Sequence, residues 1–126
     1  MVGPTKPYEL AFDERPGYLY VLVKSAEFSA TVATNYLRDV INECRELSYS
    51  RVLIVRDIEV MLSPEKNRSV AAQLANIAFA GLKIAVVEPH LESTEQERFS
   101  AQVSEGFGIE VRAFSSTPDA RRWLLN

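Results

Sequence analysis

The sequence has little of several features on which other classes of protein depend. It contains one cysteine, Cys44, so no disulfide can form within the chain. It also contains only one histidine, so a zinc site is not expected. It has no run of about 18 apolar residues, and its first residues lack the apolar stretch of a signal peptide. We therefore expect a cytoplasmic protein with no membrane span, no metal and no cofactor.

The sequence also lacks an excess of basic residues, since it has 14 lysines and arginines and 17 acidic residues, for a net charge of −3. Proteins that bind nucleic acid through its phosphates carry a basic patch, so nucleic acid is not an expected partner. What remains is the composition of an ordinary globular domain, with 47% hydrophobic and 25% charged residues in 126. A chain of this length can bury a core without disulfides, so we expect one domain over residues 1–126, with 1–7 a flexible lead-in.

Short apolar or alternating segments rich in aromatic and β-branched residues predict five strands. They cover residues 8–12, 18–23, 52–55, 84–87 and 109–114. The first two are joined by a turn over 13–17 that contains Pro16 and Gly17, which predicts a hairpin. The last alternates apolar with charged residues, which indicates an edge strand with one wetter face.

Apolar residues at spacings of three and four predict helices between the later strands. Residues 29–47 show this period, with Val32, Tyr36, Leu37, Val40, Ile41, Cys44 and Leu47 on the inward face. Further helices are predicted from Ser63 to Gly81, over about 93–106, and from Thr117. The order β-β-α-β-α-β-α-β-α predicts an α/β domain with a mostly parallel mixed sheet of about five strands and four helices.

This element order resembles the STAS (SpoIIAA-like) domain, named for sulfate transporters and anti-sigma factor antagonists. The most telling parts are the third strand ending in Asp57, and the segment 106–114 followed by Asp119, Ala120, Trp123 and Leu124. The resemblance covers nearly the whole chain and is architectural. It implies a regulatory or scaffold module of bacterial type that docks on kinases, anti-sigma factors, sensor proteins or transporter partners.

The sequence departs from that family at one functional position. In members that act as switches, a serine or threonine directly after the strand-three aspartate is phosphorylated, and here that position is Ile58. The nearest hydroxyl is Ser63, which precedes Pro64 and is best explained as a helix N-cap. Phosphorylation of Ser63 at a helix N-terminus is the alternative hypothesis.

A receiver domain is the main rival, because Asp57 stands at a strand end. Aspartyl phosphorylation needs an acidic pair after an early strand and a lysine after a late one. Here the corresponding strands end in Lys24-Ser25 and Glu88-Pro89, so the sequence does not favour a receiver domain. Glu88 and His90 could form a general acid/base couple, but a solvated surface turn is the simpler interpretation.

Several other residues have simple structural interpretations. Cys44 lies on the apolar face of a predicted helix and is expected to be a small buried hydrophobe. Asp13, Glu14 and Arg15 are expected to form a charged hairpin tip. A set of aromatic residues is expected to complete the core rather than form a docking patch. These residues are Tyr8, Phe12, Tyr18, Tyr20 and Phe79.

The sequence therefore favours a non-catalytic module that binds a protein partner, such as a kinase, an anti-sigma factor or a sensor, through the turn after strand three and the following helix. The candidate contact residues are Asp57, Ile58, Glu59, Ser63, Glu65 and Lys66. One alternative is a phosphorylation-controlled anti-sigma factor antagonist or receiver-like switch, and a second is a domain that binds a small ligand or lipid. An exposed edge strand would also permit a homodimer.

Overall fold

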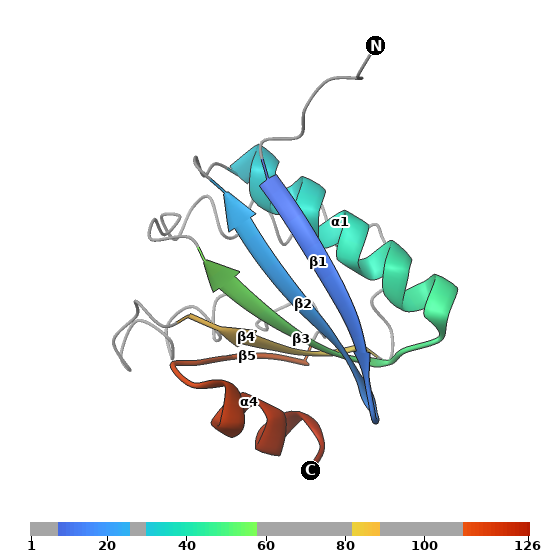
Figure 1. Ribbon diagram of the computed structural model, residues 1–126, viewed down its shortest axis with the longest axis vertical. Helices are drawn as coiled ribbons and strands as arrows, with labels where there is room; N and C mark the ends of the chain where they lie inside the picture. The colour runs from blue at the N-terminus through green and yellow to red at the C-terminus, as the bar shows by residue number, and fades with distance from the viewer. Residues whose placement is uncertain (1–7, 26–29, 58–81, 89–109) are drawn as a thin grey trace.

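The computed structural model describes residues 8–25, 30–57, 82–88 and 110–126, which form a sheet with a helix on each face (Figure 1). The strands are β1 Tyr8–Arg15, β2 Tyr18–Ser25, β3 Arg51–Asp57, β4 Lys83–Val87 and β5 Glu110–Phe114, and the helices are α1 Ala30–Leu47 and α4 Thr117–Leu124. All five predicted strands and two of the four predicted helices are thereby confirmed. The helices predicted over 63–81 and 93–106 lie outside the described residues.

The sheet is mixed, in the spatial order β1-β2-β3-β4-β5. β1 pairs antiparallel with β2, and each later strand runs parallel to the one before it. The mostly parallel sheet and the edge position of β5 are confirmed. Receiver domains share the flavodoxin-like order 2-1-3-4-5. The present order, with its antiparallel first strand, differs from that arrangement.

The hairpin is tighter than the sequence suggested. Residues 13–15 were expected in the turn, but they continue β1, and Arg15 pairs directly with Tyr18. Only Pro16 and Gly17 form the connection, with Gly17 at a φ of 86°. An edge strand tolerates the exposed charges of this segment, which is why the change from apolar to charged residues did not mark its end.

Helix α1 packs on the sheet through the side chains that its period predicted. Val32, Tyr36, Val40, Ile41 and Cys44 are buried, together with the residues of β2, β3 and β4 that point to the same face. Leu47 was predicted to face inward, but its exposed fraction is 36%, because the helix ends at this residue.

The end of α1 is a Schellman motif built on a residue other than glycine. The Tyr49 N–H donates to the Cys44 carbonyl at 2.8 Å, and the Ser48 N–H donates to the Arg45 carbonyl at 3.3 Å. Ser48 adopts a φ of 62°, in the left-handed region that glycine occupies at lower cost. The motif turns the chain directly into β3.

Helix α4 covers the opposite face of the sheet from α1 (Figure 1). Ala120 and Leu124 are fully buried against Leu53, Ala85 and Val87, and Trp123 packs at the margin. The helix begins at Thr117 as predicted, and its cap is Ser116, whose hydroxyl accepts from the Asp119 N–H. Neither described helix is sufficiently long and apolar to cross a membrane.

Candidate functional site

The carboxyl ends of the parallel strands carry the candidate site that the sequence predicted. Asp57 is the last residue of β3, and its side chain is exposed. Lys24, also exposed, is its register partner on β2, so a carboxylate and an ammonium side chain stand on adjacent strands at this end. The other predicted contact residues lie outside the described residues. They are Ile58, Glu59, Ser63, Glu65 and Lys66.

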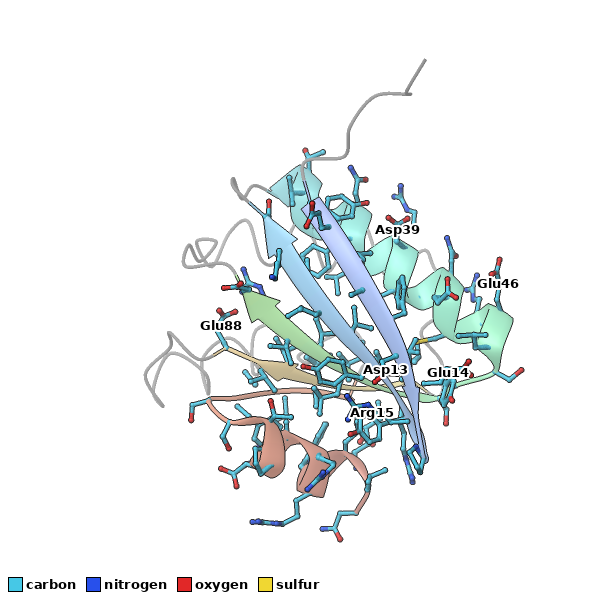
Figure 2. All side chains as sticks on the ribbon, viewed as in Figure 1. Asp13, Glu14, Arg15, Asp39, Glu46 and Glu88 are labelled. Atoms are coloured by element: carbon cyan, nitrogen blue, oxygen red, sulfur yellow. The ribbon has the colours of Figure 1, made fainter. Side chains whose placement is uncertain are left out.

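A buried ion pair lies one residue further into the same end of the sheet. Arg56 Nη1 is 2.6 Å from Glu88 Oε2, and both side chains are 2% exposed. Glu88 directly follows β4 (Figure 2), and its N–H donates to the Phe114 carbonyl at 2.7 Å, which extends the contact between β4 and β5. The interpretation of Glu88 as part of a solvated turn is therefore wrong, and His90 lies outside the described residues.

Burial dominates the electrostatics of Glu88. Removal of the carboxylate from water raises its pKa to about 7, although the charge of Arg56 and the hydrogen bond from it act in the opposite direction. Tyr36, from α1, is 4% exposed, and burial raises its pKa. The charge of Arg56 lowers the Tyr36 pKa and that of Glu88 raises it, so the hydroxyl lies within the field of both groups.

The sequence did contain a signal for Arg56. Side chains alternate along β3, so Arg56 shares the α1-facing side with Val52 and Ile54, which are 1% exposed. A charged side chain on an otherwise buried face requires a partner of opposite charge. That partner could not be named from the sequence, because Glu88 reaches Arg56 only through the pairing of β3 with β4.

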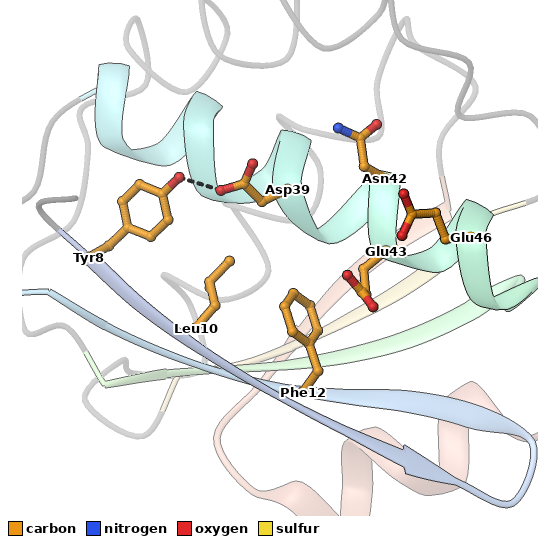
Figure 3. A pocket seen from close by; sticks show the side chains of 7 residues that line it. All are labelled: Tyr8, Leu10, Phe12, Asp39, Asn42, Glu43 and Glu46. Carbon is orange, nitrogen blue, oxygen red and sulfur yellow. Dashed lines mark hydrogen bonds between the residues drawn. The ribbon is translucent and has the colours of Figure 1, made fainter. Parts of the chain in front are cut away.

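A groove runs between the edge strand β1 and helix α1 and encloses about 430 Å³ (Figure 3). The strand contributes Tyr8, Leu10 and Phe12, and the helix contributes Asp39, Asn42, Glu43 and Glu46. The Tyr8 hydroxyl donates to Asp39 Oδ2 at 2.5 Å and closes one end. Burial and this bond raise the pKa of Tyr8 to about 12. The groove thus has an apolar strand side and an acidic helix side.

The aromatic residues divide between core and surface. Tyr8 and Tyr18 are buried, and Tyr20 is partly buried, as the core interpretation predicted. Phe12 is 38% exposed at the groove, so that interpretation is wrong for Phe12. Phe79 lies outside the described residues.

Three smaller expectations concern Cys44, the hairpin tip and metal binding. Cys44 is 1% exposed, which confirms that it is a buried hydrophobe. Asp13, Glu14 and Arg15 are exposed as expected, but they lie in β1 rather than at the hairpin tip (Figure 2). Within the ranges that the structure describes, no three histidine, cysteine, aspartate or glutamate side chains are arranged to hold a metal ion.

Comparison with known proteins supports the fold alone. No protein-family model matches the sequence, and no curated protein matches it. Among solved structures, the chain is similar to an uncharacterized protein of the DUF3478 family with a SpoIIAA-like fold from Shewanella loihica PV-4. The TM-score is 0.57 at 14% sequence identity, over 98% of each chain. The chain therefore has a SpoIIAA-like fold, as its resemblance to STAS domains implied.

Proposed function

We propose that this protein is a non-catalytic regulatory or scaffold module that binds a protein partner at the carboxyl end of β3. The observation that carries the proposal is the division of charge at this end of the sheet. Asp57 is exposed at the strand end, while the neighbouring acid, Glu88, is buried against Arg56. The exposed carboxylate beside Lys24 offers a partner a charge pair in fixed positions on two adjacent strands.

The buried pair also argues against a catalytic role for Glu88. A general base must come within hydrogen-bond distance of the proton that it removes. The Glu88 side chain is 2% exposed, and its carboxylate contacts the Arg56 guanidinium, so a substrate at the surface does not reach it. A carboxyl pKa near 7 arises in structural ion pairs as well as in active sites, and burial accounts for it here.

The mode of regulation follows from the residue after Asp57. Ile58 has no hydroxyl, so a kinase cannot phosphorylate the position that family switches use. Binding is then constitutive, or it is controlled by a change in the partner. Phosphorylation of Ser63 is the alternative to be tested, and partner contacts by Ile58, Glu59, Ser63, Glu65 and Lys66 belong to the same proposal.

Capture of binding partners from the source cells tests this function. The full chain is immobilised, the captured protein is identified, and its affinity for the purified chain is then measured. Asp57→Lys is expected to weaken binding by about tenfold, the loss typical of a contact residue that matters. Glu110→Lys makes the same charge change at an exposed acid at the amino end of β5, and it is expected to bind as the wild type does.

Mass spectrometry of the same samples separates the competing functions. Detection of phosphate on Ser63 in the captured chain would support the phosphorylation-controlled switch. A bound nucleotide, lipid or metal in the native mass spectrum would contradict the non-catalytic docking proposal and favour a ligand-binding domain. Equal partner affinity for Asp57→Lys and the wild type would show that the partner binds a surface other than the end of β3.

A further inference from the structure

We propose that the groove between β1 and α1 is a second docking surface, which binds an extended, lysine- or arginine-rich segment of another protein as an added strand beside β1. This surface is distinct from the carboxyl end of β3, and it does not depend on the function proposed for Asp57. It follows from three features of the molecule: an available strand edge, a groove of matching length beside it, and two acids, Glu43 and Glu46, that form no ion pair within the described residues.

β1 is an edge strand whose partner, within the described residues, is β2 alone. From Ala11 to Arg15 every side chain of this strand is exposed. Edges of this kind present backbone N–H and C=O groups that pair with an extended peptide. Phe12, 38% exposed on this strand, adds apolar surface where such a peptide would lie.

The two walls of the groove have similar lengths. Leu10 and Phe12 alternate with exposed residues and line the groove on the side of β1 that faces α1 (Figure 3). From Tyr8 to Phe12 the strand extends about 14 Å at 3.4 Å per residue. From Asp39 to Glu46 the helix rises about 10 Å at 1.5 Å per residue. The groove therefore accommodates an extended segment of about four or five residues.

The helix wall selects the charge of the occupant. Asp39 and Glu43 are four residues apart and Glu43 and Glu46 three, spacings at which like charges on a helix repel one another. In the described part of the chain, neither Glu43 nor Glu46 forms an ion pair. A cationic occupant would remove this repulsion, whereas an acidic one would increase it.

The side-chain spacing of an extended basic segment fits these acids. Alternate residues of a strand lie about 6.8 Å apart on one face, close to the rise of about 6 Å between Asp39 and Glu43. The methylene stems of lysine or arginine would pack on Leu10 and Phe12, with their charged ends at the helix carboxylates. Repeated basic residues at every second position are the pattern that this groove recognises.

A second copy of this chain is a poorer occupant. β1 carries the exposed acids Glu9, Asp13 and Glu14 and a single base, Arg15, which is already paired with Asp13 at 2.5 Å, so a second β1 would bring an excess of acids to this edge. Like charges placed opposite one another destabilise strand pairs. A basic segment from a different protein has the complementary charge at the same positions.

The test uses the full chain and a fluorescein-labelled peptide in which lysine alternates with valine. At low salt the peptide is expected to bind and to shift the amide NMR signals of residues 8–15 and 39–46. Glu46→Gln and Glu43→Gln are each expected to weaken binding up to about fivefold, the range for exposed ion pairs. Phe12→Ser is also expected to weaken it. Glu110→Gln is the matched control for charge and is expected to leave the affinity unchanged.

Four results would overturn the proposal. Equal weakening by Glu110→Gln and Glu46→Gln would mean general electrostatic attraction without a site. Equal binding of a peptide with N-methylated backbone amides would exclude strand addition. Self-association of the chain that Phe12→Ser abolishes would assign the groove to a second copy. If the peptide does not bind while partner capture that depends on Asp57 persists, the docking proposal for the groove is refuted and the function proposed for the end of β3 is not.

Discussion

The buried pair of Arg56 and Glu88 makes the stability of the protein depend on pH in an unusual direction. Burial raises the pKa of Glu88 from 4.5 to about 7, so between these values the native state holds a proton that the unfolded chain has released. Stability from this group is therefore fully present below pH 4.5 and decreases as the pH rises through about 7. At 1.36 kcal/mol for each pKa unit, the loss is about 3 kcal/mol.

Glu88→Gln removes the titration and keeps the shape of the side chain. The free energy of unfolding of the variant, relative to wild type, is expected to rise by about 3 kcal/mol between pH 4.5 and pH 8. Urea unfolding at several pH values, followed through the fluorescence of Trp123, the single tryptophan, measures this difference. Glu110→Gln, at an exposed position, is expected to follow the wild-type pH dependence throughout.

The opposite slope would refute this reasoning. If the attraction of Arg56 for the carboxylate exceeded the cost of its burial, the pKa of Glu88 would lie below 4.5 and wild-type stability would increase with pH. Arg56→Met separates the two effects, because it removes the influences that lower the pKa of Glu88. In this variant the pH range over which stability decreases is expected to extend above 7.

Three further predictions concern substitution or labelling of single residues. Tyr8→Phe loses the hydrogen bond to Asp39 and is expected to lower the free energy of unfolding by about 1 kcal/mol in urea titrations, whereas an unchanged value would make the bond energetically neutral. Burial raises the pKa of Cys44 to about 11, so labelling by a thiol reagent at pH 8 is expected to be slow in the native state and fast in urea. Ser48→Gly relieves the left-handed φ at the end of α1. It is expected to raise the free energy of unfolding by roughly 0.5–1 kcal/mol, which a higher melting temperature would show.

The fold could be predicted from the sequence because the apolar pattern reports burial directly. Along β3, Val52 and Ile54 pack beneath α1 while Leu53 packs beneath α4, so a continuous apolar run indicated a strand covered on both faces. The period of α1 predicted its buried face in the same way. The prediction was wrong only for Leu47, the last residue of the helix, whose exposed fraction is 36%.

The charged residues were harder to place, because their positions depend on contacts between distant segments. Arg56 and Glu88 are residue types that are normally exposed, and their burial becomes evident only once β3 and β4 are paired in register. The groove could not be predicted from the sequence for the same reason. Phe12 looked like a core residue by type, but it lies on an edge strand whose cover by α1 is incomplete.

The register of β3 determines which charges the end of the sheet presents. Successive side chains point to opposite faces, so Arg56 is directed toward α1 and Asp57 toward the other face. A slip of one residue would exchange them, leaving Asp57 buried beside Glu88 and Arg56 exposed. Two buried acids would repel one another, whereas Arg56 neutralises Glu88 at 2.6 Å. The buried pair therefore favours the one register in which Asp57 remains available to a partner.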